Sequence, residues 1–296
     1  MKILEGKVAV ITGASRGLGK SMAQTFARNC ARVVLAARST TEIAKNAADL
    51  KTEGLEAEAF ACDVSDLKQV EALALFTIEK FGKFDIWINN AGIGGPYGGT
   101  LDLSSDDFVE VLHTNINGTY FGSLVAMRHF LTRQTGKLVN ILGQGAKKPV
   151  PNQNAYGSTK SWIRVFTLAL AREYKHSGVG VFTLQPGLMD TDLLTDLVTF
   201  QEHEKQLRMI MPMLIRAGAK DPEVIAKKAL WLVSPATDGK TGFEVNVGSP
   251  LALLPGFLRE GASKLMHLPV RQVEMKVKII PSAFEPLPGS TTKIVK

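Results

Sequence analysis

The sequence predicts an α/β protein: a doubly wound parallel sheet with helices on both faces, in three α/β/α layers. Two observations support this. Short, continuously apolar runs alternate with longer amphipathic stretches over residues 1–248, which is typical of buried parallel strands joined by crossover helices. In addition, a glycine-rich turn separates the first apolar run from the first amphipathic stretch, as in nucleotide-binding sheets of this kind.

Each element follows from its local pattern. The strands are short runs rich in Val, Ile, Leu and Ala, expected at 7–12, 32–37, 56–61, 84–89, about 137–142, about 179–184 and 242–247. The helices are the amphipathic stretches between them, expected at 18–29, 40–53, 67–81, about 104–134, about 154–177 and 222–233. Gly54 and Gly82 end two of these helices. Right-handed crossovers then give the doubly wound order.

The chain divides into a domain of residues 1–248 and a C-terminal extension of residues 249–296. The segment at about 188–218 is apolar and rich in methionine, so we expect it to cover the substrate, although a core or subunit-contact role explains its composition equally well. The extension holds six prolines and is too short to form a stable domain alone. We expect it to pack on the main domain or on a neighbouring subunit.

Composition excludes several classes of protein. The 296 residues are 45% hydrophobic and 21% charged, as in ordinary globular proteins. Two cysteines exclude a disulfide scaffold and a four-cysteine zinc site, and we expect no metal. No apolar run is long enough for a membrane span, and no signal peptide is visible. We expect a cytoplasmic protein.

The charge is uneven along the chain. The net charge is +7, and the extension, with seven basic and three acidic residues, carries most of it. A basic segment can meet nucleic acid, acidic lipid or an acidic partner. Because no nucleic-acid motif accompanies the charge, we interpret the segment as solvated and expect no nucleic-acid partner.

The turn at 12–19 has the chemistry of a phosphate-binding loop. Small residues let the backbone approach a pyrophosphate closely, and the helix that follows offers free N–H groups and a favourable dipole. The residues expected to contact a dinucleotide here are Gly13, Ser15, Arg16, Gly17, Leu18 and Gly19.

The end of the second strand indicates which dinucleotide binds. A carboxylate there would hold the ribose 2′-hydroxyl of NAD, but the strand ends in Ala36-Ala37-Arg38. Arg38 can pair with a 2′-phosphate, and Arg16 adds a second cation. The sequence therefore predicts NADP, with NADPH preferred over NADH.

The Gly-xxx-Gly-x-Gly spacing of this loop resembles the short-chain dehydrogenase/reductase family, which has a Rossmann-type fold. The resemblance covers about residues 5–248 and extends to several further motifs. It implies that Asp63 and Val64 contact the adenine, that the Asn-Asn-Ala-Gly motif (with Asn90, Ala91 and Gly92) makes room for the cofactor, and that Thr191, after Pro186-Gly187, binds the nicotinamide carboxamide.

The expected reacting centre is the pair Tyr156 and Lys160, which matches the family's Y-xxx-K motif. The i, i+4 spacing places both side chains on one helix face. Free tyrosine has a pKa near about 10, and a nearby ammonium would stabilise its phenolate. The resemblance also implies that Lys160 and Tyr156 contact the nicotinamide ribose region, and that Asn115 completes a proton relay through water.

One family residue is missing. The serine that binds the substrate carbonyl lies 13 residues before the tyrosine, and here that position is Gly143; no Ser or Thr occurs between Gly136 and Tyr156. Three interpretations stay open. Gln144 supplies the donor, Tyr156 and Lys160 act without a second donor, or the protein binds cofactor and turns over slowly or not at all.

We therefore expect an NADP(H)-dependent oxidoreductase that transfers hydride between NADPH and a carbonyl or alcohol with an apolar portion. The alternative is a cofactor-binding protein of the same fold with little or no catalysis. The long helices at 104–134 and 154–177 are the family's usual dimer faces, so we expect a homodimer or homotetramer. Peripheral membrane contact through residues 251–258 and the basic extension is a further hypothesis that we do not favour.

Overall fold

The computed structural model describes residues 2–248, 253–266 and 269–287. Its central sheet has seven parallel strands in the order β3-β2-β1-β4-β5-β6-β8. These strands are β1 (Val8–Thr12), β2 (Arg32–Ala37), β3 (Ala57–Ala61), β4 (Ile86–Asn89), β5 (Gly136–Ile141), β6 (Val179–Gln185) and β8 (Glu244–Asn246). The order reverses between β1 and β4, which places a crevice at the carboxyl ends of these two strands. The predicted fold class is confirmed.

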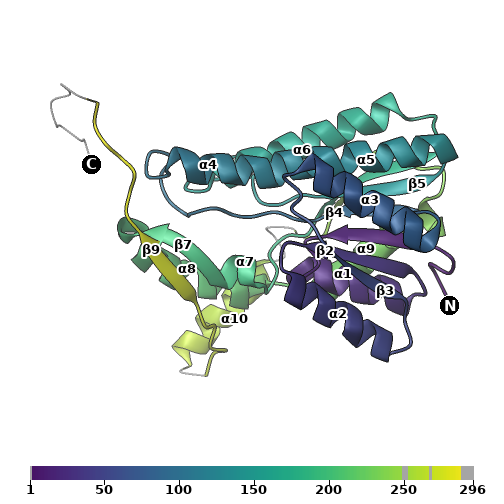
Figure 1. Ribbon diagram of the computed structural model, residues 1–296. Helices are drawn as coiled ribbons and strands as arrows, with labels where there is room; N and C mark the ends of the chain where they lie inside the picture. The colour runs from purple at the N-terminus through teal and green to yellow at the C-terminus, as the bar shows by residue number, and fades with distance from the viewer. Residues whose placement is uncertain (1, 249–252, 267–268, 288–296) are drawn as a thin grey trace.

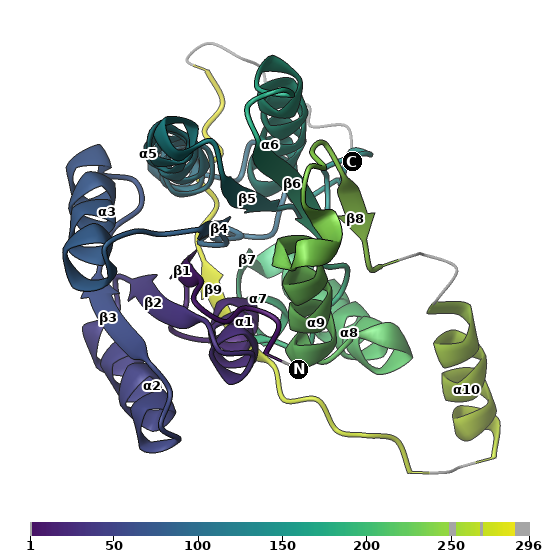
Figure 2. The same ribbon diagram turned by 90° about the vertical axis from the view of Figure 1, so that its right-hand side faces the viewer.

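Helices cover both faces of the sheet (Figure 1). They are α1 (Gly17–Arg28), α2 (Thr40–Thr52), α3 (Leu67–Phe81), α4 (Ser105–Leu112), α5 (Gly118–Arg133), α6 (Asn154–Glu173) and α9 (Pro222–Val233). Figure 2 shows α1, α2 and α9 on one side of the sheet and α3, α5 and α6 on the other. The buried apolar residues form one large cluster on each side, so both faces of the sheet carry a core. Every residue of β1 is buried, as its unbroken apolar run predicts.

Helix ends follow the chain's capping residues. Asp66 accepts a hydrogen bond from the backbone N–H of Lys68 at the start of α3, and Gly82 ends that helix with a φ of 78°. Asp221 caps α9, whose first residue is Pro222. These residues explain why α3 and α9 lie at their predicted ranges.

Two predicted helices differ from the structure. The stretch 104–134 is interrupted by a π-helical turn, His113–Asn117, between α4 and α5. The helix expected to reach residue 177 ends at Glu173. The fourth strand starts at Ile86 rather than at residue 84, and the Phe84 N–H donates to Nε2 of His129 at 3.3 Å instead of to a neighbouring strand.

The segment expected to cover the substrate has its own structure, with α7 (Asp192–Thr195), β7 (Asp196–Phe200) and α8 (Gln201–Gly218). The extension packs against it. Strand β9 (Lys276–Ile280) pairs in parallel with β7, and helix α10 (Leu254–Leu265) lies against α8 (Figure 1). Ion pairs join Arg216 of α8 to Glu260 of α10 and Arg271 to Asp190. The extension therefore holds residues 190–218 from outside.

No helix among the described residues is long and apolar enough to cross a membrane.

Candidate active site

The phosphate loop lies between β1 and α1, and glycine is required at three of its positions. Gly13 and Gly17 have φ values of 65° and 55°, a region that favours glycine. A Cβ atom at Gly19 would lie 2.2 Å from the Gly13 carbonyl oxygen. Gly19 therefore allows α1 to start directly against the loop, although it does not line the cleft described below.

Two asparagines hold this loop in place. The side-chain amide of Asn90 donates to the carbonyl oxygens of Thr12 at 2.9 Å and Gly13 at 3.2 Å. Asn46, a residue of α2 that sequence reasoning missed, donates to the Ser15 carbonyl at 2.8 Å. Asn90, which follows β4, thus ties the end of that strand to the end of β1 and to the loop.

A cleft of about 470 Å³ opens above the loop at the carboxyl ends of the strands. Its walls include most of the residues predicted for the cofactor, namely Gly13, Ser15, Arg16, Gly17, Leu18, Arg38, Asp63, Val64, Asn90, Ala91, Gly92 and Thr191. They also include residues that no motif singled out: Ala37, Ser39, Glu42, Cys62, Ile93, Thr114, Met189, Asp192 and Leu193. The predicted Pro186, Gly187, Tyr156 and Lys160 lie outside these walls. Gly187 instead packs against Gly248, where a Cβ atom would lie 2.7 Å from the Gly248 Cα.

The two arginines predicted to bind a 2′-phosphate lie on the rim of the cleft. The Arg38 side chain is 58% exposed, and its Nη1 lies 4.0 Å from Oε1 of Glu110. Arg16 pairs at 3.2 Å with Asp192 of α7. This ion pair joins the phosphate loop to the segment at about 188–218. Both pairs are exposed, and such pairs contribute little to stability. Breaking either ion pair therefore costs little free energy, so each arginine can turn to a ligand.

The reacting centre lies at the start of α6. Lys160 is buried, with its ammonium 3.3 Å from the Ile141 carbonyl oxygen and 5.4 Å from the centre of the Tyr156 ring. Burial raises the pKa of Tyr156 to about 12 and lowers the pKa of Lys160 to about 8. Burial thus determines the direction of the Tyr156 pKa shift, which is opposite to the lowering expected from the ammonium. The phenol is protonated at neutral pH and can donate its proton.

Asn115 occupies the π-helical turn and is fully buried. Its amide donates to the Ile93 carbonyl at 3.0 Å and the Thr159 hydroxyl at 3.1 Å, and its oxygen accepts from the Ile93 N–H at 2.9 Å. A Cβ atom at Gly92 would lie 3.0 Å from the Asn115 oxygen and 3.5 Å from the Lys160 nitrogen. Gly92 thus connects the cleft to the reacting centre, and a Cβ atom there would press on the Asn115 amide oxygen while making ordinary contact with the Lys160 nitrogen.

The position of the missing serine is closed to side chains. Gly143 is buried, whereas Gln144 is exposed and makes no hydrogen bond to the part of the chain that the structure describes. Gln144 lies in the loop between β5 and α6, as expected.

Strand β7 is joined to Tyr97, a residue about 100 positions earlier in the chain. The Tyr97 N–H donates to the Val198 carbonyl of β7 at 2.8 Å, and the Thr199 hydroxyl donates to the Tyr97 carbonyl at 2.7 Å. The Tyr97 hydroxyl accepts from the Asn152 amide at 3.4 Å. Because β9 pairs with β7, hydrogen bonds to β7 join the extension and Tyr97 to the same strand.

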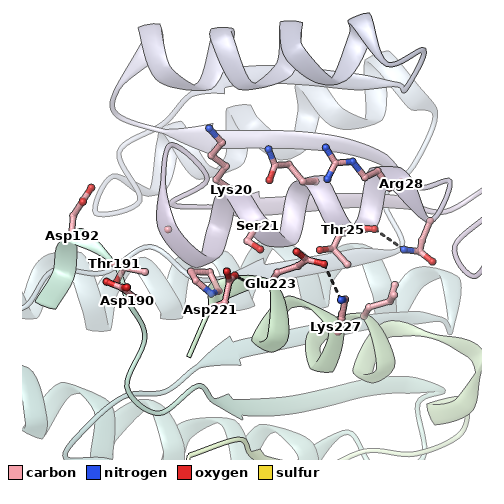
Figure 3. Close-up of a pocket in the computed structure, with 15 residues that line it drawn as sticks. Lys20, Ser21, Thr25, Arg28, Asp190, Thr191, Asp192, Asp221, Glu223 and Lys227 are labelled. Carbon is pink, nitrogen blue, oxygen red and sulfur yellow. Dashed lines mark hydrogen bonds and ion pairs between the residues drawn. The ribbon is translucent and has the colours of Figure 1, made fainter. Parts of the chain in front are cut away.

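A second hollow of about 690 Å³ lies between α1 and α9 (Figure 3). It carries both charges, for example Lys20 on α1 and Glu223, which pairs with Lys227 at 2.8 Å. Thr191 and Asp192 separate it from the cofactor cleft, since both residues line both hollows. This mixed polar lining differs from the apolar walls typical of small-molecule sites.

Comparisons with known proteins agree with this geometry. Residues 7–202 match the family model described as short chain dehydrogenase. Glucose 1-dehydrogenase 2 of Bacillus subtilis (strain 168) is 32% identical over 87% of this chain and 99% of its own length. 3beta-hydroxysteroid dehydrogenase 1 of Eggerthella lenta is 33% identical over 86% of this chain and 97% of its own.

Among solved structures, the 3-ketoacyl-(acyl-carrier-protein) reductase from Brucella melitensis, complexed with NADH, superposes with a TM-score of 0.73. It is 31% identical, and the match covers 82% of this chain and 97% of that chain. The chain belongs to the short-chain dehydrogenase/reductase family of oxidoreductases, which bind a nicotinamide cofactor and act on keto and hydroxyl groups.

Proposed function

We propose that the protein is an NADP(H)-dependent oxidoreductase that reduces a carbonyl group on a substrate with an apolar portion. The observation that carries this is the position of Gly92. It lines the dinucleotide cleft, and its Cβ position lies 3.5 Å from the Lys160 nitrogen. The acid–base pair and the cofactor cleft therefore share one wall.

The cleft fits a dinucleotide with a 2′-phosphate. Gly13 and Gly17 open the loop toward the start of α1, whose free N–H groups favour a pyrophosphate. Arg38 stands where a carboxylate would select a 2′-hydroxyl, and its guanidinium is exposed to the cleft rim. The nearby carboxylates of Glu42 and Glu110 oppose this charge, but neither occupies the strand end. The neighbouring structure of the Brucella reductase holds NADH, so the preference of this chain rests on Arg38 and Arg16.

In the proposed mechanism, the reduced dinucleotide supplies the hydride when bound. Tyr156 donates its hydroxyl proton to the substrate oxygen as negative charge develops there. Its raised pKa keeps that proton in place at neutral pH, which suits reduction. Lys160 holds an ammonium beside the phenol and stabilises the phenolate that forms. Asn115 bonds to the Ile93 backbone and to the Thr159 hydroxyl, and Thr159 precedes Lys160 in α6.

The apolar portion of the substrate would contact the side chains that remain open on the cleft wall. Several apolar side chains of the segment at about 188–218 are already used in packing, since Leu197, Phe200 and Leu207 are buried. Ile93 and Leu193 instead line the cleft. These residues favour an apolar group next to the reacting carbonyl.

The test is NADPH oxidation with a panel of ketones and aldehydes, followed at the nicotinamide absorbance band. The proposal expects turnover of at least one apolar carbonyl compound, and loss of turnover in Tyr156→Phe with unchanged NADPH binding. Binding of NADPH without turnover of any substrate, with no difference between the two proteins, would instead support the non-catalytic alternative.

A further inference from the structure

The loop of residues 143–145 and the start of α6 approach each other more closely than side chains allow. A Cβ atom at Gly143 would lie 2.0 Å from the Tyr156 hydroxyl oxygen and 2.9 Å from its Cζ. A Cβ atom at Gly145 would lie 2.3 Å from the Cα of Gly157. These are two neighbouring contacts, Gly143 with Tyr156 and Gly145 with Gly157, and Tyr156 and Gly157 are adjacent in the helix.

Two polar bonds lie close to these contacts. The Ser161 hydroxyl donates to the Gly145 carbonyl at 2.6 Å, one turn along α6 from Gly157. The Lys160 ammonium donates to the Ile141 carbonyl at the end of β5. Both bonds lie one turn beyond Tyr156 and Gly157, and they fix this part of α6 against the end of β5 and the loop.

The backbone at Gly143 does not itself require glycine. Its φ lies outside the left-handed region, unlike that of Gly145 at 94°. A serine would fit the backbone there, so the obstacle to a side chain is the Tyr156 hydroxyl. The absence of a serine and the position of the phenol are therefore linked, because the Tyr156 hydroxyl lies where a side chain at position 143 would begin.

We propose that Gly143 is a positioning residue whose missing side chain, together with the Gly145–Gly157 contact, admits the Tyr156 hydroxyl into the volume where a serine side chain would begin. This inference rests on the proposed function. It implies that the substrate oxygen has a single protein donor at this point, Tyr156, and that restoring the family's serine does not restore a second one.

The test is Gly143→Ser, with Gly261→Ser as the matched control, because Gly261 is a helical glycine with nothing within 4 Å of its Cβ position. We expect Gly143→Ser to lower kcat for carbonyl reduction on the order of 10²-fold, since a displacement of about 1 Å has that effect. NADPH binding should not change. A kcat that rises or stays the same would overturn the proposal.

A spectroscopic readout separates positioning from simple damage and does not depend on activity. The titration of Tyr156 alone is obtained by measuring tyrosinate absorbance against pH in a protein and in its Tyr156→Phe counterpart, and subtracting the second curve from the first. In the parent protein the phenol should stay protonated to about pH 11, because its pKa is raised to about 12. Gly143→Ser should move the phenol toward solvent and lower its pKa toward about 10. An unchanged titration would contradict the inference.

A double-mutant cycle covers the case in which Gly143→Ser folds poorly. The Tyr156→Phe change removes the oxygen that lies nearest to the new Cβ atom. Gly143→Ser should therefore destabilise the Tyr156→Phe protein less than the parent protein in chemical denaturation. Equal destabilisation in both backgrounds would show that the phenol hydroxyl is not what excludes a side chain. If the parent protein reduces no carbonyl compound, the proposed function fails, and the titration and the cycle still decide this inference.

Discussion

Removal of the Arg38 guanidinium should weaken NADPH binding and leave NADH binding unchanged. The side chain is 58% exposed, and its nearest carboxylate, on Glu110, is 4.0 Å away. An exposed pair of this kind contributes about 0–1 kcal/mol, so little is lost when Arg38 turns to a ligand. A hydrogen bond to a charged group contributes about 1.5–3 kcal/mol. Solvent exposure places the net effect at the lower end, about 1–2 kcal/mol.

That free energy corresponds to a rise of about 5- to 30-fold in the Kd for NADPH in Arg38→Ala. Titration calorimetry with NADPH and NADH measures both constants. The matched control is Arg128→Ala on α5, because Arg128 is 65% exposed, pairs with Glu71 at 3.5 Å and lies outside the cleft walls. Equal weakening of both dinucleotides, or no change in either, would refute the assignment of Arg38 to a 2′-phosphate.

Two further predictions concern pH and assembly. Because burial lowers the pKa of Lys160 to about 8 from its ordinary 10.5, the unfolded chain binds more protons than the folded chain between these values. Stability from this group should therefore rise with pH above about 8, by at most about 2 kcal/mol at pH 9.5. Denaturation at about pH 7 and 9.5 should show that rise in the parent protein and not in Lys160→Met; the same rise in both would exclude Lys160 as its source. On α6, Val165 is 64% exposed near the stacked rings of Trp162 and Phe166. If α6 forms the contact of the expected homodimer or homotetramer, Val165→Glu should lower the mass measured by light scattering; an unchanged oligomer mass would exclude Val165 from such a contact.

The sheet and most of its helices could be predicted from the sequence because their patterns are local. A strand such as β1 is buried on both faces and reads as an unbroken apolar run. The range of α9 is predicted correctly because Asp221 and Pro222 mark its start. Such signals depend on neighbouring residues alone.

The π-helical turn could not be predicted in this way. One wide turn within a long helix leaves the apolar periodicity on either side nearly unchanged, yet it includes Asn115. The pairing of β9 with β7 could not be predicted from the sequence either, because the two segments are far apart in the chain and the extension is rich in proline. Its short length and its prolines predicted only an extension that packs on the main domain or on a neighbouring subunit.

In the candidate site too, features set by local sequence could be predicted, whereas contacts between distant segments could not. Gly13, Gly17 and Arg38 stand at fixed offsets from strands, so their place in the cleft could be predicted. The contact between Gly143 and Tyr156 depends on how closely α6 approaches the preceding loop, and no sequence pattern reports that distance. The sequence therefore showed that a serine is missing without showing what fills its place.

The most direct test of the account is the single-turnover rate of carbonyl reduction with NADPH and with NADPH that carries deuterium at the transferred position. In the parent protein we predict a slower rate with deuterium. In Tyr156→Phe we predict a rate lower on the order of 10²- to 10⁴-fold, with the same NADPH affinity. An unchanged rate in Tyr156→Phe, or a parent protein that binds neither dinucleotide, would contradict the claim that Tyr156 is the proton donor of an NADPH-dependent reductase.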